Sequence, residues 1–203
     1  MKYIIMADGA ETRWKRHLGI HKWEININGE TLIERTSRLL RERDPLAEII
    51  ITTHEKIEVE DVKIHVPQNN CFEIDRFTEE LVKPGVCFLY GDVYYTEQAI
   101  NIIVSKIVET ISFLGNEKKI FAVKVEDDEL FKRHLRKVRE AYINDEIEEC
   151  IGWELYHSIQ GMPLESREIG SGFVRIEDET RDFNYPEDLN IFVGRKESKD
   201  RCK

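Results

Sequence analysis

Several features are missing from this sequence of 203 residues. No apolar run is long enough to span a bilayer, and the N-terminus, where Met1-Lys2 leads into a short apolar stretch, lacks a signal-peptide pattern. We therefore expect no membrane association and a cytoplasmic location. The cysteines are few and form no CxxC pair, so we expect free thiols rather than disulfides or a zinc site. They are Cys71, Cys87, Cys150 and Cys202.

Positive charge is also scarce. The chain has 30 Lys and Arg residues against 40 Asp and Glu, a formal net charge of −10. Duplex nucleic acid needs a positive footprint on its partner, so we predict no nucleic-acid binding. Small phosphorylated ligands need only a few local cations, and the charge does not exclude them. Without internal repeats, low-complexity segments or linkers, the length predicts one domain, residues 1–194, followed by a frayed polar tail, residues 195–203.

Apolar patterns along the chain predict strands that alternate with helices. Short apolar or β-branched runs, most bounded by turn residues, predict strands at residues 3–7, 23–27, 47–53, 62–66, 85–89, 120–125 and 172–176. Helices are predicted from a capping box at Thr31 and Glu34, over 96–113 and 127–142, and from Pro186. Residues 143–169 show only a weak pattern, which suggests a partly buried irregular region. This alternation indicates an α/β domain with a mostly parallel sheet.

The loop after the first strand carries a candidate phosphate site. Gly9 lets a ligand approach the backbone closely, Thr12 supplies a hydroxyl, and Arg13 supplies a fork suited to phosphate. More basic residues follow, up to Lys22, and successive backbone N–H groups beside them would suit a polyphosphate. Ligands of open parallel sheets lie beyond the carboxyl ends of strands, where Gly91-Asp92 also falls. Taken alone, the loop fits an ordinary turn with a solvated basic stretch equally well.

Four landmarks in order resemble the nucleotidyltransferase family with a glycosyltransferase-A-like fold. The family opens with Ala-Ala-Gly-x-Gly-[Thr/Ser]-Arg and a Pro-Lys pair. It continues with Gly-x-Pro-Leu before a helix, a metal-binding Asp after a middle strand, and Asp-x-Asp-[Thr]-Pro-Glu-Asp-Leu near the end. The matching segments are residues 7–13 with His21-Lys22, 29–35, 88–93 and 182–189. The resemblance implies a single-domain Rossmann-like three-layer αβα sandwich with a mixed, mostly parallel sheet.

The resemblance also implies roles for individual residues. Arg13, Lys22 and Asp92 would be catalytic, and Asp92 would hold Mg²⁺ together with Asn184 or, alternatively, Asp182. The nucleotide would be bound by Ala7, Asp8, Gly9, Ala10, Glu11, Thr12, Arg13 and Gly91.

The implied reaction moves a nucleoside monophosphate from an NTP to a phosphorylated small acceptor, a sugar-1-phosphate or a phosphoalcohol, and releases pyrophosphate. CTP or UTP is the favoured donor, surface-polysaccharide or glycoconjugate synthesis is the expected setting, and a homodimer is a further possibility. Positioning and charge neutralisation would supply most of the catalysis.

Three departures from the pattern leave alternatives open. Glu11 replaces the second glycine, His21 replaces the proline, and Asn184 replaces an aspartate. A carboxylate ~4 Å from a phosphate charge costs on the order of 4 kcal/mol at an effective dielectric of ~20, so Glu11 suggests a module that binds nucleotides with little or no activity. A glycosyltransferase is another alternative, although Gly91-Asp92-Val93-Tyr94 lacks the Asp-x-Asp of that class. Trp14 either covers the nucleotide or packs on the loop.

Overall fold

A computed structural model describes residues 1–170 and 172–200, with side chains described up to residue 194. Its centre is a seven-stranded sheet in the order β10-β8-β9-β6-β1-β4-β5. Every neighbouring pair is parallel except the two that involve β9, which runs antiparallel to β6 and β8. The mixed, mostly parallel sheet is thereby confirmed. The strands are β1 (Lys2–Met6), β4 (Glu48–Thr52), β5 (Lys63–His65), β6 (Val86–Tyr90), β8 (Ile111–Gly115), β9 (Ile120–Val125) and β10 (Phe173–Arg175).

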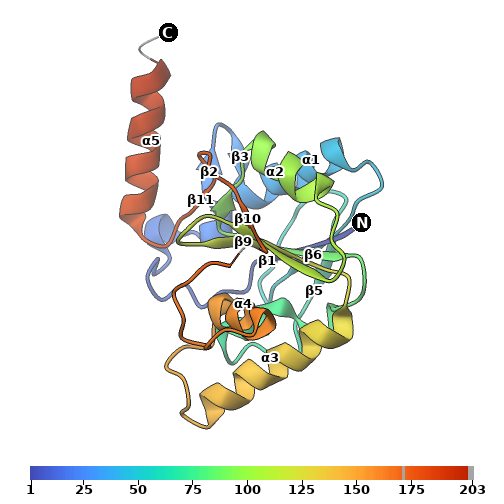
Figure 1. The fold of residues 1–203 in the computed structure, drawn as a ribbon. Coiled ribbons are helices and arrows are strands. Elements are labelled where there is room, and N and C mark those ends of the chain that lie inside the picture. Colours follow the sequence, from blue (N-terminus) through green and yellow to red (C-terminus); the bar gives the residue numbers. More distant parts are fainter. Residues whose placement is uncertain (171, 201–203) are drawn as a thin grey trace.

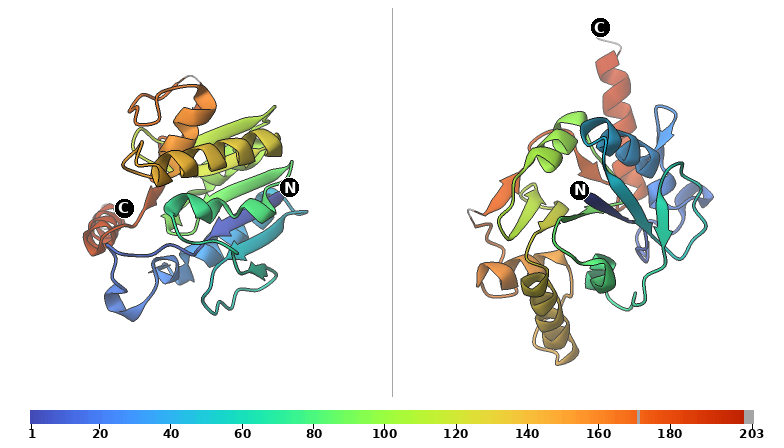
Figure 2. Two further views of the ribbon diagram at one scale, coloured as in Figure 1. Left: turned by 90° about the horizontal axis from the view of Figure 1, so that it is seen from below. Right: turned by 90° about the vertical axis from the view of Figure 1, so that its right-hand side faces the viewer.

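Helices cover both faces of this sheet, which gives the three layers expected (Figure 1). One face carries α1 (Leu32–Arg43) and α2 (Glu97–Ser105), and the other carries α3 (Asp128–Ile143) and α4 (Gly152–Gln160), as the end-on views of Figure 2 also show. Successive side chains of a strand point to opposite faces. In β1, Ile4 faces the α3 and α4 layer while Ile5 faces the α1 and α2 layer, and both are fully buried. Burial on both faces explains the unbroken apolar run of this strand.

The helix predicted over residues 96–113 is only half right. The helix α2 ends at Ser105, and residues 111–115 form β8 instead. Lys124 of β9 donates its Nζ to the carbonyl oxygens of Ile103 and Lys106, at 3.0 and 2.6 Å, and so satisfies groups at the helix terminus that have no helical partner. The apolar residues beyond Ser105 that continue the helical spacing pair with β9 in the sheet.

Two other weak predictions are corrected. Residues 143–169 contain a regular helix, α4, whose Leu155 and Tyr156 are fully buried. The strand predicted over 23–27 is a short 3-10 helix (Lys22–Glu24) followed by β2 (Asn26–Ile27). A turn at Asn28-Gly29, with φ of +59° and +91°, joins β2 to β3 (Glu30–Thr31). Further 3-10 helices are His17–Gly19, Glu73–Phe77 and Glu79–Leu81.

After the edge strand β10, the C-terminal part forms a separate two-stranded sheet with β7 (Val93–Tyr94). β11 (Arg181–Asp182) pairs antiparallel with β7, and α5 (Pro186–Asp200) leads away from the body of the molecule (Figure 1). The backbone of 195–200 is helical where a frayed tail was expected, and residues 201–203, with Cys202, lie outside the described residues. Cys71, Cys87 and Cys150 are free thiols, as predicted. In the described part of the chain, no helix is long and apolar enough to cross a membrane.

Candidate active site

The predicted loop and Gly91-Asp92 start side by side, because β1 and β6 are neighbours in the sheet. Met6 and Tyr90, the last residues of the two strands, are register partners. The Gly91 amide donates to the Met6 carbonyl at 2.9 Å. A Cβ at Gly91 would lie 2.8 Å from the same oxygen, a clash with backbone that only glycine avoids. The structure therefore gives Gly91, a predicted nucleotide-binding residue, a backbone role in joining the strand ends.

The β7–β11 pairing brings the C-terminal candidates to Asp92. Asp182 is the register partner of Val93, and the Phe183 amide donates to the Asp92 carbonyl at 3.1 Å. Asp188, in the first turn of α5, accepts from the Asn184 amide at 2.9 Å. A carboxylate there caps free N–H groups of the helix start. Pairing and cap together fix Asn184 beside Asp92.

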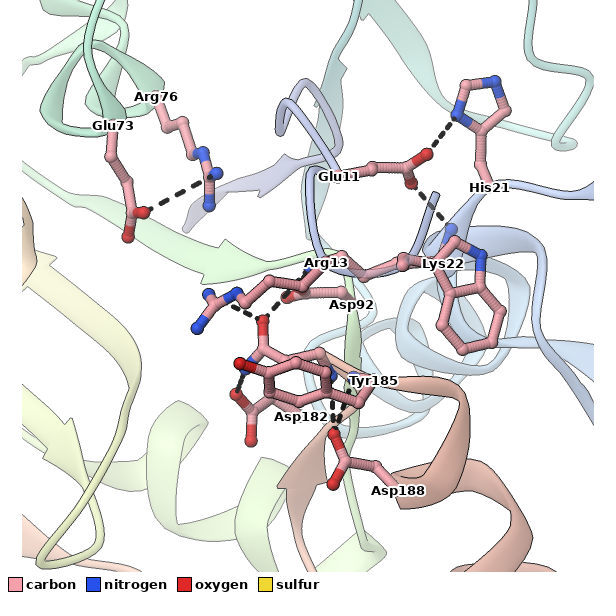
Figure 3. A network of polar contacts seen from close by, with 12 residues as sticks. Glu11, Arg13, His21, Lys22, Glu73, Arg76, Asp92, Asp182, Tyr185 and Asp188 are labelled. Atoms are coloured by element: carbon pink, nitrogen blue, oxygen red, sulfur yellow. Dashed lines mark hydrogen bonds and ion pairs between the residues drawn. The ribbon is translucent and has the colours of Figure 1, made fainter. Parts of the chain in front are cut away.

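Lys22 links the Asp92 carboxylate to Asn184, which also accepts from Arg13 (Figure 3). Lys22 Nζ lies 2.7 Å from Asp92 Oδ2 and 3.2 Å from Asn184 Oδ1, and Arg13 Nη2 lies 3.1 Å from that same Asn184 oxygen. Lys22 is 7% exposed. Burial acts to raise the pKa of Asp92, but the charge and hydrogen bond of Lys22 outweigh it and hold the pKa below its usual value. The site therefore contains a carboxylate whose pKa is held low by its pairing with the buried Lys22.

These side chains line a cleft of about 530 Å³. Of the predicted nucleotide-binding residues, Thr12 and Arg13 line it. The basic groups of its wall are Arg13, Lys22, Arg76, Lys118 and Lys119, and the acidic groups are Glu73, Asp92, Glu149 and Asp182. Local charge is thus slightly positive in a chain whose net charge is −10. Such a cleft favours an anionic ligand.

The carboxylate of Glu11 faces away from this cleft. Its Oε1 accepts from the Lys22 amide at 2.7 Å, and its Oε2 lies 3.1 Å from His21 Nδ1 (Figure 3). The side chain is 10% exposed. The expected repulsion between Glu11 and a bound triphosphate has no geometric support, because the carboxylate is already engaged on the far side of the loop.

Asp8 and Gly9 shape the start of the loop. Asp8 accepts from the amide and ring of His54 at 3.0 and 2.7 Å, and from Asn70 Nδ2 at 2.7 Å. The Arg76 guanidinium lies over Gly9, where a Cβ would be 3.0 Å from Arg76 Nη2. Asp8 therefore anchors the loop to its neighbours, while Gly9 makes room for a cation that lines the cleft.

Trp14 packs rather than covering a ligand. It is 1% exposed, lies among buried residues such as Leu32 and Phe183, and donates its Nε1 to the Ile20 carbonyl at 2.9 Å.

Three residues that line the cleft, Lys118, Lys119 and Trp153, were not predicted from the sequence. The two lysines lie in the short β8–β9 connection, and a turn between strands carries no motif. Lys119 Nζ pairs with Asp182 at 2.8 Å.

A second hollow of about 780 Å³ adjoins the cleft and shares Lys118, Glu149, Ile151 and Trp153 with it. Its other walls come from α4 and the chain after it, including Glu154 and Arg167. Burial raises the pKa of Glu154 to about 7. A two-part cavity can hold a larger ligand than the cleft alone.

The residues at Asp92 fit a hard cation. Among the residues that the structure describes, no three His, Cys, Asp or Glu side chains form a ready-made metal cluster. The candidate oxygen ligands are the carboxylates of Asp92 and Asp182 and the amide oxygen of Asn184. Lys22 Nζ bonds both Asp92 and Asn184, and Asn184 Nδ2 donates to Asp182. Mg²⁺ prefers one or two carboxylates completed by substrate phosphates and water, which this set matches.

Similarity to known proteins supports the fold of this chain but not a particular substrate. No known family model and no curated protein matches the sequence. Among solved structures, the chain is similar to a CTP:phosphocholine cytidylyltransferase from Streptococcus pneumoniae, with TM-score 0.57 and 14% identity over 94% of this chain and 96% of that one. It is also similar to 2-C-methyl-D-erythritol 4-phosphate cytidylyltransferase from Thermus thermophilus, with TM-score 0.56 and 14% identity over 94% and 95% of the two chains.

A third similar structure is a UTP-bound UGPase from Acinetobacter baumannii, with TM-score 0.61 and 12% identity over 92% and 89% of the two chains. These proteins share the nucleotidyltransferase fold with this chain over nearly its full length. The predicted fold is therefore confirmed, while identities this low leave substrates to be argued from the site itself.

Proposed function

We propose that this protein is a nucleotidyltransferase that transfers a nucleoside monophosphate from an NTP to a phosphorylated small acceptor. An oxygen of the acceptor phosphate attacks the α-phosphorus and forms a new P–O bond. The bond from the α-phosphorus to the bridging oxygen breaks, and pyrophosphate leaves with the electron pair. The observation that carries the proposal is the Lys22–Asp92–Asn184–Arg13 network, because it sets cations and a candidate metal ligand together at the strand ends.

The chain's own residues bind and orient the charged groups. Arg13 offers a guanidinium fork to the phosphates, and Lys22 places a desolvated ammonium where negative charge accumulates. In a cleft partly shielded from water, such fixed charges stabilise the transition state more than they would in solution. Mg²⁺ held by Asp92 with Asn184 or Asp182 would neutralise phosphate charge.

The hollow beside the cleft suits the body of the acceptor. It opens from the cleft at Glu149 and Trp153 and carries carboxylates, which accept hydrogen bonds from hydroxyl groups. A sugar-1-phosphate or a phosphoalcohol would set its phosphate near Lys118 and Lys119 and its hydroxyls in the hollow. CTP and UTP remain the favoured donors, and glycoconjugate synthesis is the corresponding setting. The similar structures include proteins named for cytidylyl transfer and one with UTP bound, which supports this choice.

A matrix of NTPs against phosphorylated acceptors, read by pyrophosphate release with and without Mg²⁺, tests the proposal. One pair should turn over only with Mg²⁺, and Asp92→Asn should reduce kcat by about 100-fold or more, the usual scale for losing a transition-state charge partner. Asp145→Asn, at an exposed position that does not line the cleft, is the matched control and should leave kcat unchanged. Full turnover by Asp92→Asn would disprove the role of this carboxylate. Stabilisation by NTPs without turnover on any acceptor would favour the binding module.

A further inference from the structure

The Glu11 carboxylate joins the two ends of the loop that runs from Glu11 to Lys22. Glu11 Oε1 accepts from the Lys22 amide at 2.7 Å, and Glu11 Oε2 pairs with His21 Nδ1 at 3.1 Å. Both side chains are nearly buried, Glu11 at 10% and His21 at 12% exposure. Buried hydrogen bonds to an ionised acceptor are stronger than exposed ones, so this tie is well placed to hold the two ends of the loop together.

The backbone conformation at Glu11 is one that suits glycine better than glutamate. Its φ is +50°, in the left-handed region that glycine adopts freely and other residues adopt with strain. A glycine here would relax the turn. What the glutamate adds is therefore the tie itself, made at the expense of backbone strain.

The residues that Glu11 contacts are held by further contacts, and they lead to the Lys22 side chain. The His21 ring stacks on Trp23 at 4.8 Å between centroids, and the His21 amide donates to Glu24 Oε2 at 2.7 Å. Trp23 in turn is buried in the α1 and α2 layer of the core. From the backbone that Glu11 grips, the Lys22 side chain reaches 2.7 Å from Asp92.

We infer that Glu11 is a positioning residue that holds the Lys22 backbone so that Nζ stays between Asp92 and Asn184. The inference rests on the proposed function, since the value of a fixed Lys22 is to meet phosphate charge. Glu11 does not itself line the cleft and acts through the backbone of Lys22, which does. Misplacing a catalytic group by about 1 Å costs on the order of 100-fold in rate, so a tie of this kind affects turnover more than substrate affinity.

Two substitutions separate this role from charge repulsion. Glu11→Gln keeps an oxygen to accept from the Lys22 amide and an amide to donate to the His21 ring, but removes the charge. Glu11→Gly removes both contacts and relieves the backbone. Positioning predicts NTP affinity near wild type for both, kcat near wild type for Glu11→Gln, and kcat lowered by about 10-fold or more for Glu11→Gly. Repulsion predicts tighter NTP binding for both variants.

A readout without turnover comes from hydrogen exchange at the Lys22 amide in the substrate-free protein. Glu11→Gly should speed that exchange by about 10-fold or more, while Glu11→Gln should change it little. Glu55→Gln is the control, since Glu55 lies 3.6 Å from His21 Nε2 but does not bond the Lys22 amide. Unchanged exchange in Glu11→Gly, or equal damage in Glu11→Gln, would overturn the inference. If wild type turns over no substrate pair, the proposed function fails, and the exchange result still decides whether the tie exists.

Discussion

Lys22 illustrates how a single buried charge depends on its partners. At 7% exposure its ammonium has lost most of its water, and Asp92 and Asn184 supply the compensating contacts. Leaving one member of such a pair buried and unpaired costs about 3–5 kcal/mol in other proteins. Substitutions at Asp92 therefore affect stability as well as activity, so the thermal unfolding of Asp92→Asn must be measured beside its kcat.

Glu154 provides a test of the hollow at the residue scale. Burial raises its pKa from 4.5 to about 7, so the folded state holds this proton more tightly than the unfolded state does. Its contribution to the free energy of unfolding is fully present below pH 4.5 and is lost as the pH rises through about 7. Glu154→Gln should keep the helix-start contact with the Ile151 amide and remove this loss.

We expect Glu154→Gln to exceed wild type in free energy of unfolding by about 1–2 kcal/mol at pH 8.5, with a much smaller gap at pH 5. Urea unfolding of both proteins at the two pH values measures this. An equal gap at both pH values would show that ionisation of Glu154 does not contribute. The unfolding is measured without ligands, so its outcome does not depend on the proposed reaction.

At the scale of elements, the site is made by strand ends that backbone contacts force together. Gly91 is the tightest of these contacts, with no room for a Cβ against the Met6 carbonyl. Gly91→Ala should lower the free energy of unfolding by about 1–3 kcal/mol, the usual cost of overpacking. It should also weaken turnover, since Asp92 follows directly. Gly194→Ala is the control, because its Cβ would meet nothing within 4 Å and alanine favours the helix.

Denaturant unfolding of the two glycine variants decides this point. A Gly91→Ala protein as stable as wild type would mean that the strand ends separate easily, and the close approach would then not be what positions Asp92. Loss of stability in Gly194→Ala would point instead to an unrelated effect of added methyl groups.

The sequence predicted elements well where one periodicity dominated. Most strand predictions and the Thr31–Glu34 capping box agree with the structure, because apolar runs and caps are local signals. The helix over 96–113 failed because apolar spacing continues past Ser105, while the Lys124 cap that ends α2 comes from a distant strand. The position of Asp182 beside Asp92 also depends on a long-range pairing, β7 with β11.

Part of the candidate site also follows from local signals. Arg13, Lys22, Asp92 and Asn184 were predicted as site residues from landmarks along the chain, and the structure brings all four together, while their roles stay predictions. The direction of the Glu11 side chain depends on where residues 21 and 22 lie, which no local pattern encodes. Lys118 and Lys119 gave no signal because a turn between strands carries no motif.

At the scale of the whole molecule, the charge is unevenly distributed, with several cations gathered at the cleft. The net charge of −10 belongs to the surface as a whole, whereas the cleft wall has five cations against four carboxylates. The fold itself is shared with chains only 12–14% identical, so it permits nucleotidyl transfer without specifying a substrate. The chemistry must therefore be tested on the atoms transferred.

Following the α-phosphate of a labelled NTP tests nucleotidyl transfer most directly. With NTP labelled at the α-phosphorus, a phosphorylated acceptor and Mg²⁺, the account predicts a labelled acceptor–nucleotide product formed in one-to-one ratio with pyrophosphate. That product should be lost in Asp92→Asn. Label that remains in NTP for every acceptor, or appears only as free nucleoside mono- or diphosphate, would contradict the account.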